Sequence, residues 1–342
     1  MTIVMGLDVH REQITFDALD TDTGEVRRGR IRPADRKTLR RFLGDFDGQP
    51  VKAALEATTG WRFVVEELRA AGAEAHLAEP AETRALRGRK RRPKTDRLDA
   101  RHLRDLLLAG RLPESWIPPQ HLLELRSKVR LRKTLVDERS AWQQRIHAQL
   151  FHHGFPRSSG LLAASRRAQL ASLALPPAAR LQIETAFSLI DSITAQLAPL
   201  ERDLRSFARA QVGCRALMQH FGIGELTSVA ILAELGDARR FSSSRHAVRF
   251  AGLDVTVLES DEQRAPGKLS HQGSPILRWA LFEAAQCACR TGSPDHDYYL
   301  QASARLNHKR ATLSVARKLA RRVHHTLREL GSEALLPAEG TV

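Results

Sequence analysis

Two aspartates, Asp96 and Asp99, stand three residues apart at the start of a segment whose leucines recur at helical spacing. Residues at positions i and i+3 lie on one face of a helix, so both carboxylates point the same way. The cations that crowd this segment include Arg87, Arg89, Lys90, Arg91, Arg92 and Lys94. Carboxylates set among cations indicate acids that hold a metal ion and cations that hold phosphate. The alternative is an ordinary helix start, because aspartate is favoured in a first turn.

Two further acids end apolar runs that read as strands: Asp8 in residues 2–9 and Glu56 in residues 51–56. In mixed α/β folds, sites form just outside the carboxyl ends of strands. Four carboxylates meeting there would repel each other, and two Mg²⁺ ions would relieve the repulsion. Such a pair of ions stabilises the attacking and leaving oxygens of phosphoryl transfer. Each acid alone is typical of a cap or surface position, but their order and setting predict a magnesium site.

The N-terminal elements that must position these acids follow the order β-β-β-α-β-α-β-α. Apolar patterns predict strands at 2–9, 14–18, 26–31, 51–56 and 74–78, and helices at 33–46 and 61–71. A further helix starts at Asp96. This order predicts a mixed α/β layer fold over residues 1–117.

From Pro118 onward the sequence predicts long helices, at 120–150 and 181–208. In the second, apolar residues from Ile183 to Phe207 alternate at spacings of three and four, which is the seam of a coiled coil. Pro199 falls inside it and is expected to kink the helix or start another. The two helices could pair within one chain or between chains. We expect residues 118–211 to serve self-association, giving a dimer or tetramer.

Residues 212–332 are expected to form a mostly helical third domain. Gly222 and Gly224 lie between two short apolar helices, as in a helix-hairpin-helix element whose backbone N–H groups reach a phosphate. An ordinary helix–helix turn is the alternative. A loop-like run at 255–273, a helix at 274–290 and a basic helix at 307–330 follow. The residues expected to contact nucleic acid in this domain are Gly222, Gly224, Lys268, Arg278, Arg317, Lys318 and Arg321.

The composition narrows the class of partner. The chain of 342 residues carries a formal net charge of +15, which favours a polyanion such as nucleic acid. No run of residues has the length of an apolar membrane span, and the apolar start is interrupted by Asp8, unlike a signal peptide. The three cysteines have no metal-binding spacing and indicate a reducing compartment. We therefore expect a cytoplasmic protein without a membrane partner.

Several motifs resemble those of one family. GLDVHRE around Asp8, LEATTGW around Glu56 and KTDRLDARHL around Asp96 and Asp99 resemble the DEDD insertion-sequence transposases. GIGELTSVAILAELGD, FAGLD and GKLSHQGSPILRWALFEAA resemble the C-terminal domain of the same family, so the likeness covers almost the whole chain in order. The resemblance implies an N-terminal RNase H-like (RuvC-like) domain and a recombinase that moves its own element. It also implies tetramers and a structured bridge RNA that pairs with target and donor DNA.

The resemblance further implies a serine nucleophile in the C-terminal domain. Counting back from GKLSHQG, the Ser-Gly pair of the family falls on Ser260 and Asp261. Asp261 replaces the usual glycine, which removes backbone freedom and adds an acid beside an incoming phosphate. Ser270 is the fallback nucleophile. From the residues alone Ser260 is a loop serine, and the metal held by the four acids is its most economical activator.

Three functions remain open on the sequence. The first is an RNA-guided, Mg²⁺-dependent DNA recombinase that uses Asp8, Glu56, Asp96, Asp99 and Ser260. The second is a RuvC-like nuclease that never forms a serine adduct. The third is a nucleic-acid-binding protein whose acids are incidental.

Overall fold

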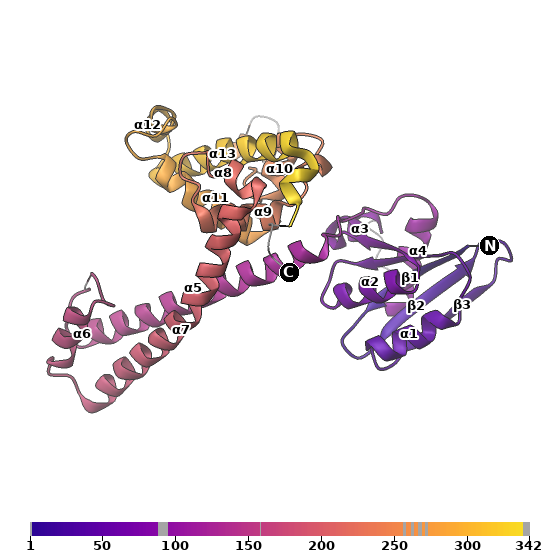
Figure 1. Ribbon diagram of the computed structural model, residues 1–342, viewed down its shortest axis with the longest axis horizontal. Coiled ribbons are helices and arrows are strands. Elements are labelled where there is room, and N and C mark those ends of the chain that lie inside the picture. The colour runs from indigo at the N-terminus through magenta and orange to yellow at the C-terminus, as the bar shows by residue number, and fades with distance from the viewer. Residues whose placement is uncertain are drawn as a thin grey trace. The chain divides into compact units, whose positions relative to one another are not determined.

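The computed structural model describes residues 2–87, 95–157, 159–255, 258–260, 263–265, 269–270 and 273–337. The chain divides into two compact units, Met1–Ile117 and Pro118–Val342. Figure 1 shows a sheet with helices in the first unit and an almost wholly helical second unit. This mixture of an RNase H-like α/β part and a helical part confirms the predicted fold class.

The first unit is built on one mixed sheet. Its strands are β1 (Ile3–Val9), β2 (Ile14–Asp20), β3 (Val26–Ile31), β4 (Val51–Glu56) and β5 (Glu74–Ala78), in the order β3-β2-β1-β4-β5. β2 is antiparallel to β1 and β3, whereas β4 is parallel to β1 and β5. The carboxyl ends of β1 and β4 therefore lie at the same edge of the sheet.

Side-chain alternation along β1 produces the two helical layers. Ile3, Met5 and Leu7 enter the core that the sheet shares with α1 (Arg36–Gly44) and α2 (Trp61–Ala70). Gly6 faces α4 (Asp96–Leu108), where an added Cβ would lie 1.9 Å from the carbonyl oxygen of Ala100. A residue without a side chain at position 6 therefore lets α4 lie directly on β1. α3 (Pro80–Leu86) precedes α4.

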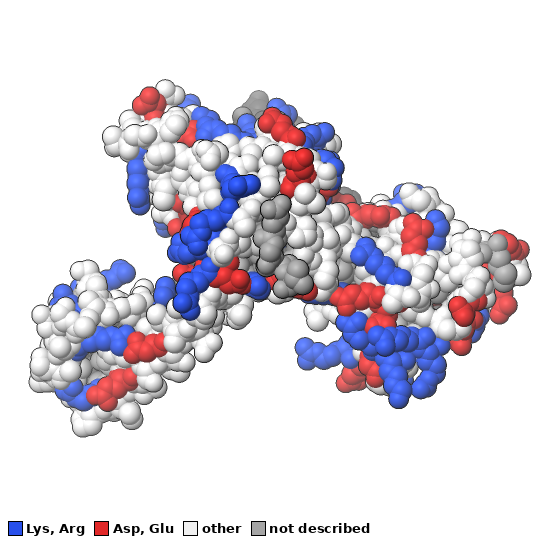
Figure 2. Space-filling view, in the orientation of Figure 1, with Lys and Arg blue, Asp and Glu red and all other residues white. Residues whose placement is uncertain are grey.

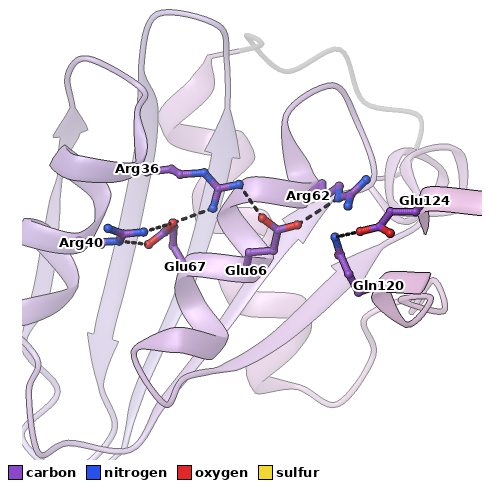
Figure 3. A network of polar contacts seen from close by, with 7 residues as sticks. All are labelled: Arg36, Arg40, Arg62, Glu66, Glu67, Gln120 and Glu124. Carbon is purple, nitrogen blue, oxygen red and sulfur yellow. Dashed lines mark hydrogen bonds and ion pairs between the residues drawn. The ribbon is translucent and has the colours of Figure 1, made fainter. Parts of the chain in front are cut away.

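A network of ion pairs joins α1 to α2 (Figure 3). Glu67 of α2 is buried, and its carboxylate accepts hydrogen bonds from Arg36 at 2.7 Å and from Arg40. Glu66 accepts from Arg36 and, at 3.0 Å, from Arg62. The hydrogen bond from Arg40 is the main cause that lowers the pKa of Glu67. The network holds both helices on the sheet face opposite α4.

Two long helices dominate the first part of the second unit. α5 (Gln120–His152) and α7 (Pro177–Ala210) pack side by side, and the short α6 (Ala164–Ala171) lies between them in the chain. Heptad residues Ile183 and Ile190 are buried in one cluster with Ile146 of α5. The heptad seam is thus used for pairing within one chain. α7 continues through Pro199, so no second helix starts there. The first turn of α5 also holds a hydrogen bond from Gln120 to Glu124, at 2.8 Å, drawn in Figure 3.

The rest of the second unit is a set of shorter helices around α13. These are α8 (Val212–Leu217), α9 (Glu225–Leu235), α10 (Ser244–Phe250), α11 (Pro275–Ala288), α12 (His296–Ser303) and α13 (His308–Leu330), with 3-10 turns η1 (Ala238–Arg240) and η2 (Gly331–Leu335). In the part of the chain that the structure describes, no helix is long and apolar enough to cross a membrane.

The segment 255–273, expected to be a loop, contains a small hairpin instead. β6 (Leu258–Ser260) pairs with β7 (Gln263–Ala265) in antiparallel register. A bridge between Val255 and Leu269 continues the pairing toward the base of the hairpin. The strands are short and mostly polar, so they carry no hydrophobic alternation that would have predicted them.

Candidate metal and nucleic-acid site

Asp8 lies near the carboxyl end of β1, on the sheet face that α4 covers. Its side chain is 17% exposed, and the pKa of Asp8 is raised mainly by burial. His10 acts against that rise and places Nε2 3.1 Å from the Asp8 carboxylate and 3.7 Å from that of Asp96. The charges of Asp99 and Asp96 raise the pKa of Asp8 further.

Glu56 ends β4, the parallel neighbour of β1. The last residue pair in the register of the two strands is Leu7 with Leu55, and Asp8 and Glu56 are the next residues on each strand. Burial raises the pKa of Glu56, Arg87 lowers it, and the charges of Asp8 and Asp99 raise it. Asp8 and Glu56 therefore lie close enough for the charge of Asp8 to raise the pKa of Glu56.

The first turn of α4 supplies the remaining two acids. Thr95 caps this helix by accepting a hydrogen bond from the backbone N–H of Leu98 at 3.3 Å. Asp99 is 13% exposed and pairs with Arg87, which follows α3 and also lies 3.9 Å from Glu56. Asp96 is more open, at 42% exposed.

Gln13 connects the acidic edge to a neighbouring cation. Its side-chain amide donates to the Asp96 carboxylate at 3.1 Å and accepts from Nε of Arg32 at 2.8 Å. Neither Gln13 nor His10 was expected from the sequence. His10 had a usable signal, because it directly follows the strand, two residues after Asp8, a spacing that puts both side chains on one face if the chain stays extended. Gln13 had none, because its contacts come from β2 meeting α4.

Two of the four acids, Asp8 and Asp96, could hold a divalent cation together with His10, whereas Glu56 and Asp99 lie beside Arg87. One carboxylate oxygen each from Asp8 and Asp96 and a ring nitrogen of His10 all lie within 4.8 Å of one another. Hard cations take carboxylate oxygens as ligands, and Mg²⁺ needs few from the protein. The raised pKa values of Asp8 and Glu56 reflect burial and like charges that a bound cation would offset.

The structure describes the backbone but not the side chain at Ser260. Ser260 is the last residue of β6 and pairs with Gln263, and its neighbour Asp261 lies outside the described residues. The hydroxyl of the fallback residue Ser270 donates to Asp254, and its backbone N–H donates to the Asp254 carbonyl at 3.1 Å. The four acids belong to the first unit and both serines to the second.

The residues expected to contact nucleic acid have varied surroundings. Gly222 has a φ of +90°, and a Cβ there would lie 2.3 Å from the Ala284 carbonyl oxygen, so packing against α11 already requires glycine. Nothing crowds Gly224, the cap of α9. Arg89, Lys90, Arg91, Arg92, Lys94 and Lys268 lie outside the described residues.

Three cations on the helices of the second unit make internal contacts. Nε of Arg317 donates to the Leu253 carbonyl at 2.6 Å, and Arg278 lies 3.5 Å from that of Ala251. Lys318 pairs with Asp295 at 3.3 Å. Arg321 of α13 is exposed. Arg317 and Arg278 thus hold the FAGLD segment before the hairpin, whatever else they bind.

Comparison with known proteins gives two family matches. A model of the DEDD class, described as "Transposase", matches residues 5–154, and the "Transposase IS116/IS110/IS902 family" model matches residues 214–300. The four acids fall in the first range and the hairpin in the second.

Individual relatives carry the same description. A Pseudomonas aeruginosa protein named "Probable family 20 transposase" is 25% identical over 302 residues, 84% of each chain. "Putative transposase y4rJ" of Sinorhizobium fredii is 30% identical over 263 residues, 69% of this chain and 65% of that one. "Transposase for insertion sequence element IS1111A" of Coxiella burnetii is 23% identical over 176 residues, 49% of this chain and 47% of that one.

Proposed function

Because the chain belongs to the IS110 family of DEDD transposases, we propose that it cuts and rejoins DNA through a serine–DNA intermediate at a Mg²⁺ site. Asp8, Glu56, Asp96 and Asp99 would hold the metal, and Ser260 would be the nucleophile. The observation that carries the proposal is that ligand atoms of Asp8, Asp96 and His10 lie within 4.8 Å of one another, with Asp99 and Glu56 near enough to Asp8 for the like charges to raise a pKa.

The chemistry at the serine is a phosphodiester exchange. A bond forms between the Ser260 oxygen and phosphorus while the bond from phosphorus to a sugar oxygen breaks. The serine hydroxyl loses one proton and the leaving sugar oxygen gains one, so the step balances without an added reactant. Attack by a second strand's hydroxyl on the serine ester rejoins the DNA. A Mg²⁺ ion held by the four acids would supply positive charge at the phosphate.

We assign three parts of the chain to three tasks. Residues 1–117 carry the acids, residues 118–211 the paired long helices that support a dimer or tetramer, and residues 212–332 the serine. A structured guide RNA, implied by the family likeness, would select target and donor DNA by base pairing. DNA as substrate would place this action in the bacterial cytoplasm.

The direct test is to trap the protein on DNA and map the covalent adduct by mass spectrometry. We expect a phosphoserine linkage at Ser260, none in Ser260→Ala, and a retained linkage in Ser270→Ala, because Ser270 is already bonded to Asp254. A Ser260→Ala protein that cuts DNA at the parent rate would instead support a RuvC-like nuclease. Binding without cutting, under all metal conditions, would support a nucleic-acid-binding protein.

A further inference from the structure

The register of the sheet places cations of β3 on the same face as Asp8. Asp8 pairs with Thr15 of β2, and Thr15 pairs with Arg30 of β3. Residues directly opposite across strands project to one face. Arg30 therefore lies two strands away from Asp8, a distance of about 9–10 Å at the usual strand spacing. Arg28 shares this face, where its Nε donates to Asp17 at 2.7 Å.

The intervening residues of β3 face the other layer. The guanidinium of Arg27 lies 4.9 Å from the ring centroid of Phe46, and Ile31 is buried in the core under α1 and α2. β3 thus carries arginines of two kinds. Arg28 and Arg30 face the side of the acids, and Arg27 faces away from it.

The side of β3 that carries Arg28 and Arg30 is open. α4 packs on β1, β2 and β4, whereas β3 lies at the edge of the sheet. The Arg28 side chain is 44% exposed although its partner Asp17 is buried and also binds Arg104 of α4. Arg30 is exposed and, among the residues that the structure describes, makes no hydrogen bond or ion pair.

Arg32 extends this line of cations to the acidic edge. It is exposed and reaches Asp96 through Gln13, with Nε 2.8 Å from the Gln13 oxygen. Arg28, Arg30 and Arg32, the β3 arginine row, alternate along the chain. Successive members within the strand are about 6.8 Å apart. The row therefore starts at the candidate metal site and runs along the open edge of the sheet.

The cations of α1 form a second basic surface, which Figure 2 shows as a blue area over that helix. Two of them, Arg36 and Arg40, pair with Glu66 and Glu67 of α2. They also lie on the sheet layer opposite α4 and the acids. The charge of the α1 surface is therefore partly neutralised. This surface also lies on the opposite face of the sheet from the acids, so it does not adjoin a DNA strand bound at the acidic site.

We propose that the β3 arginine row binds the phosphate backbone of the DNA beside the phosphodiester that is cut, a proposal that rests on the proposed function. Arginine matches phosphate geometry with paired N–H donors, and its charge does not titrate. Edge strands also use charge to prevent pairing with other chains. That protective role would be served equally by Arg27 and needs no link to Asp96.

The test compares Arg30→Gln with the matched control Arg27→Gln in the full chain. Binding to a short mixed-sequence DNA duplex is measured by fluorescence anisotropy over a series of salt concentrations. Each phosphate contact contributes about 0.9 to the slope of log affinity against log salt. We expect Arg30→Gln to lose about that much slope, Arg30→Lys to retain it, and Arg27→Gln to match the parent. A merely structural role would change thermal unfolding but not this slope.

Two results would overturn the proposal that the β3 arginine row binds DNA phosphates. One is an unchanged slope in Arg30→Gln, and the other is an equal loss in Arg27→Gln and Arg30→Gln. Either result, in a protein that still forms the serine adduct, would leave the proposed function intact. Absence of an adduct and of metal-dependent cutting in the parent protein would remove the proposed function itself, whatever the slopes.

Discussion

At the scale of single residues, environment rather than residue type distinguishes Asp8 and Glu56 from the other carboxylates. Asp8 and Glu56 are partly buried beside Asp99, and burial is the main cause that raises the pKa of each. Most other acids whose pKa shifts, such as Glu67 and Asp191, have it lowered by an arginine partner. The ionised forms of Asp8 and Glu56 therefore lower the stability of the folded protein, which is typical of carboxylates in a binding site.

Replacing Asp8 by asparagine should stabilise the protein when no metal is bound. A carboxyl group with a raised pKa in the fold contributes stability below its unfolded pKa of about 3.9, and that contribution is lost as the pH rises through its folded pKa. We therefore expect Asp8→Asn to melt above the parent at pH near 7 and to lose this advantage below about pH 4.

Thermal unfolding with and without Mn²⁺ or Mg²⁺ checks this expectation. Metal that binds only the folded parent should raise its melting temperature and reverse the order of the two proteins. A metal-free Asp8→Asn protein that melts below the parent at neutral pH would contradict the account, as would an equal metal response in both.

At the scale of elements, the sequence predicted the strands of the first unit well and their tertiary partners poorly. Apolar runs marked β1 and β4 and the acids at their ends. Contacts made by Gln13 and Arg87 depend on how α3 and α4 meet the sheet, and no local pattern encodes that. The β6–β7 hairpin was missed because its polar residues look like a loop. Strands marked by apolar periodicity could be predicted, whereas contacts made by packing of helices on the sheet could not.

Docking of α4 on β1 should be sensitive to one methyl group. In Gly6→Ala the new Cβ would meet the Ala100 carbonyl oxygen at 1.9 Å and the Arg104 nitrogen at 2.7 Å, so α4 must shift and carry Asp96 and Asp99 with it. We expect a loss of about 3 kcal/mol or more in the free energy of unfolding, and weaker metal binding.

The matched control is Gly44→Ala at the end of α1, where an added Cβ meets nothing within 4 Å. It should change the free energy of unfolding by less than about 1 kcal/mol, in the stabilising direction. Chemical denaturation of both variants measures the difference. Equal stability of Gly6→Ala and Gly44→Ala would show that α4 does not depend on this close approach.

At the scale of the whole molecule, the chain separates its two candidate reactive groups. The acids belong to the first unit and Ser260 to the second, and α5 and α7 pair with each other between them in the chain. The sequence predicted this order and the heptad seam, but left open whether the helices pair within or between chains. The buried cluster of Ile146, Ile183 and Ile190 is formed within one chain. Pairing within the chain leaves other surfaces of these helices for the proposed self-association.

The most direct measurement is the rate of DNA cutting in Mg²⁺ by Glu56→Gln beside Glu74→Gln. Glu56 ends β4 among the acids. Glu74 begins the neighbouring parallel strand β5, so it lies at the opposite end of the strands from Glu56. We expect Glu56→Gln to cut at least about 100-fold more slowly, because a bound metal contributes several kcal/mol to phosphoryl transfer. Glu74→Gln should cut at the parent rate. A Glu56→Gln protein that cuts as fast as the parent would contradict a metal site at the carboxyl ends of β1 and β4.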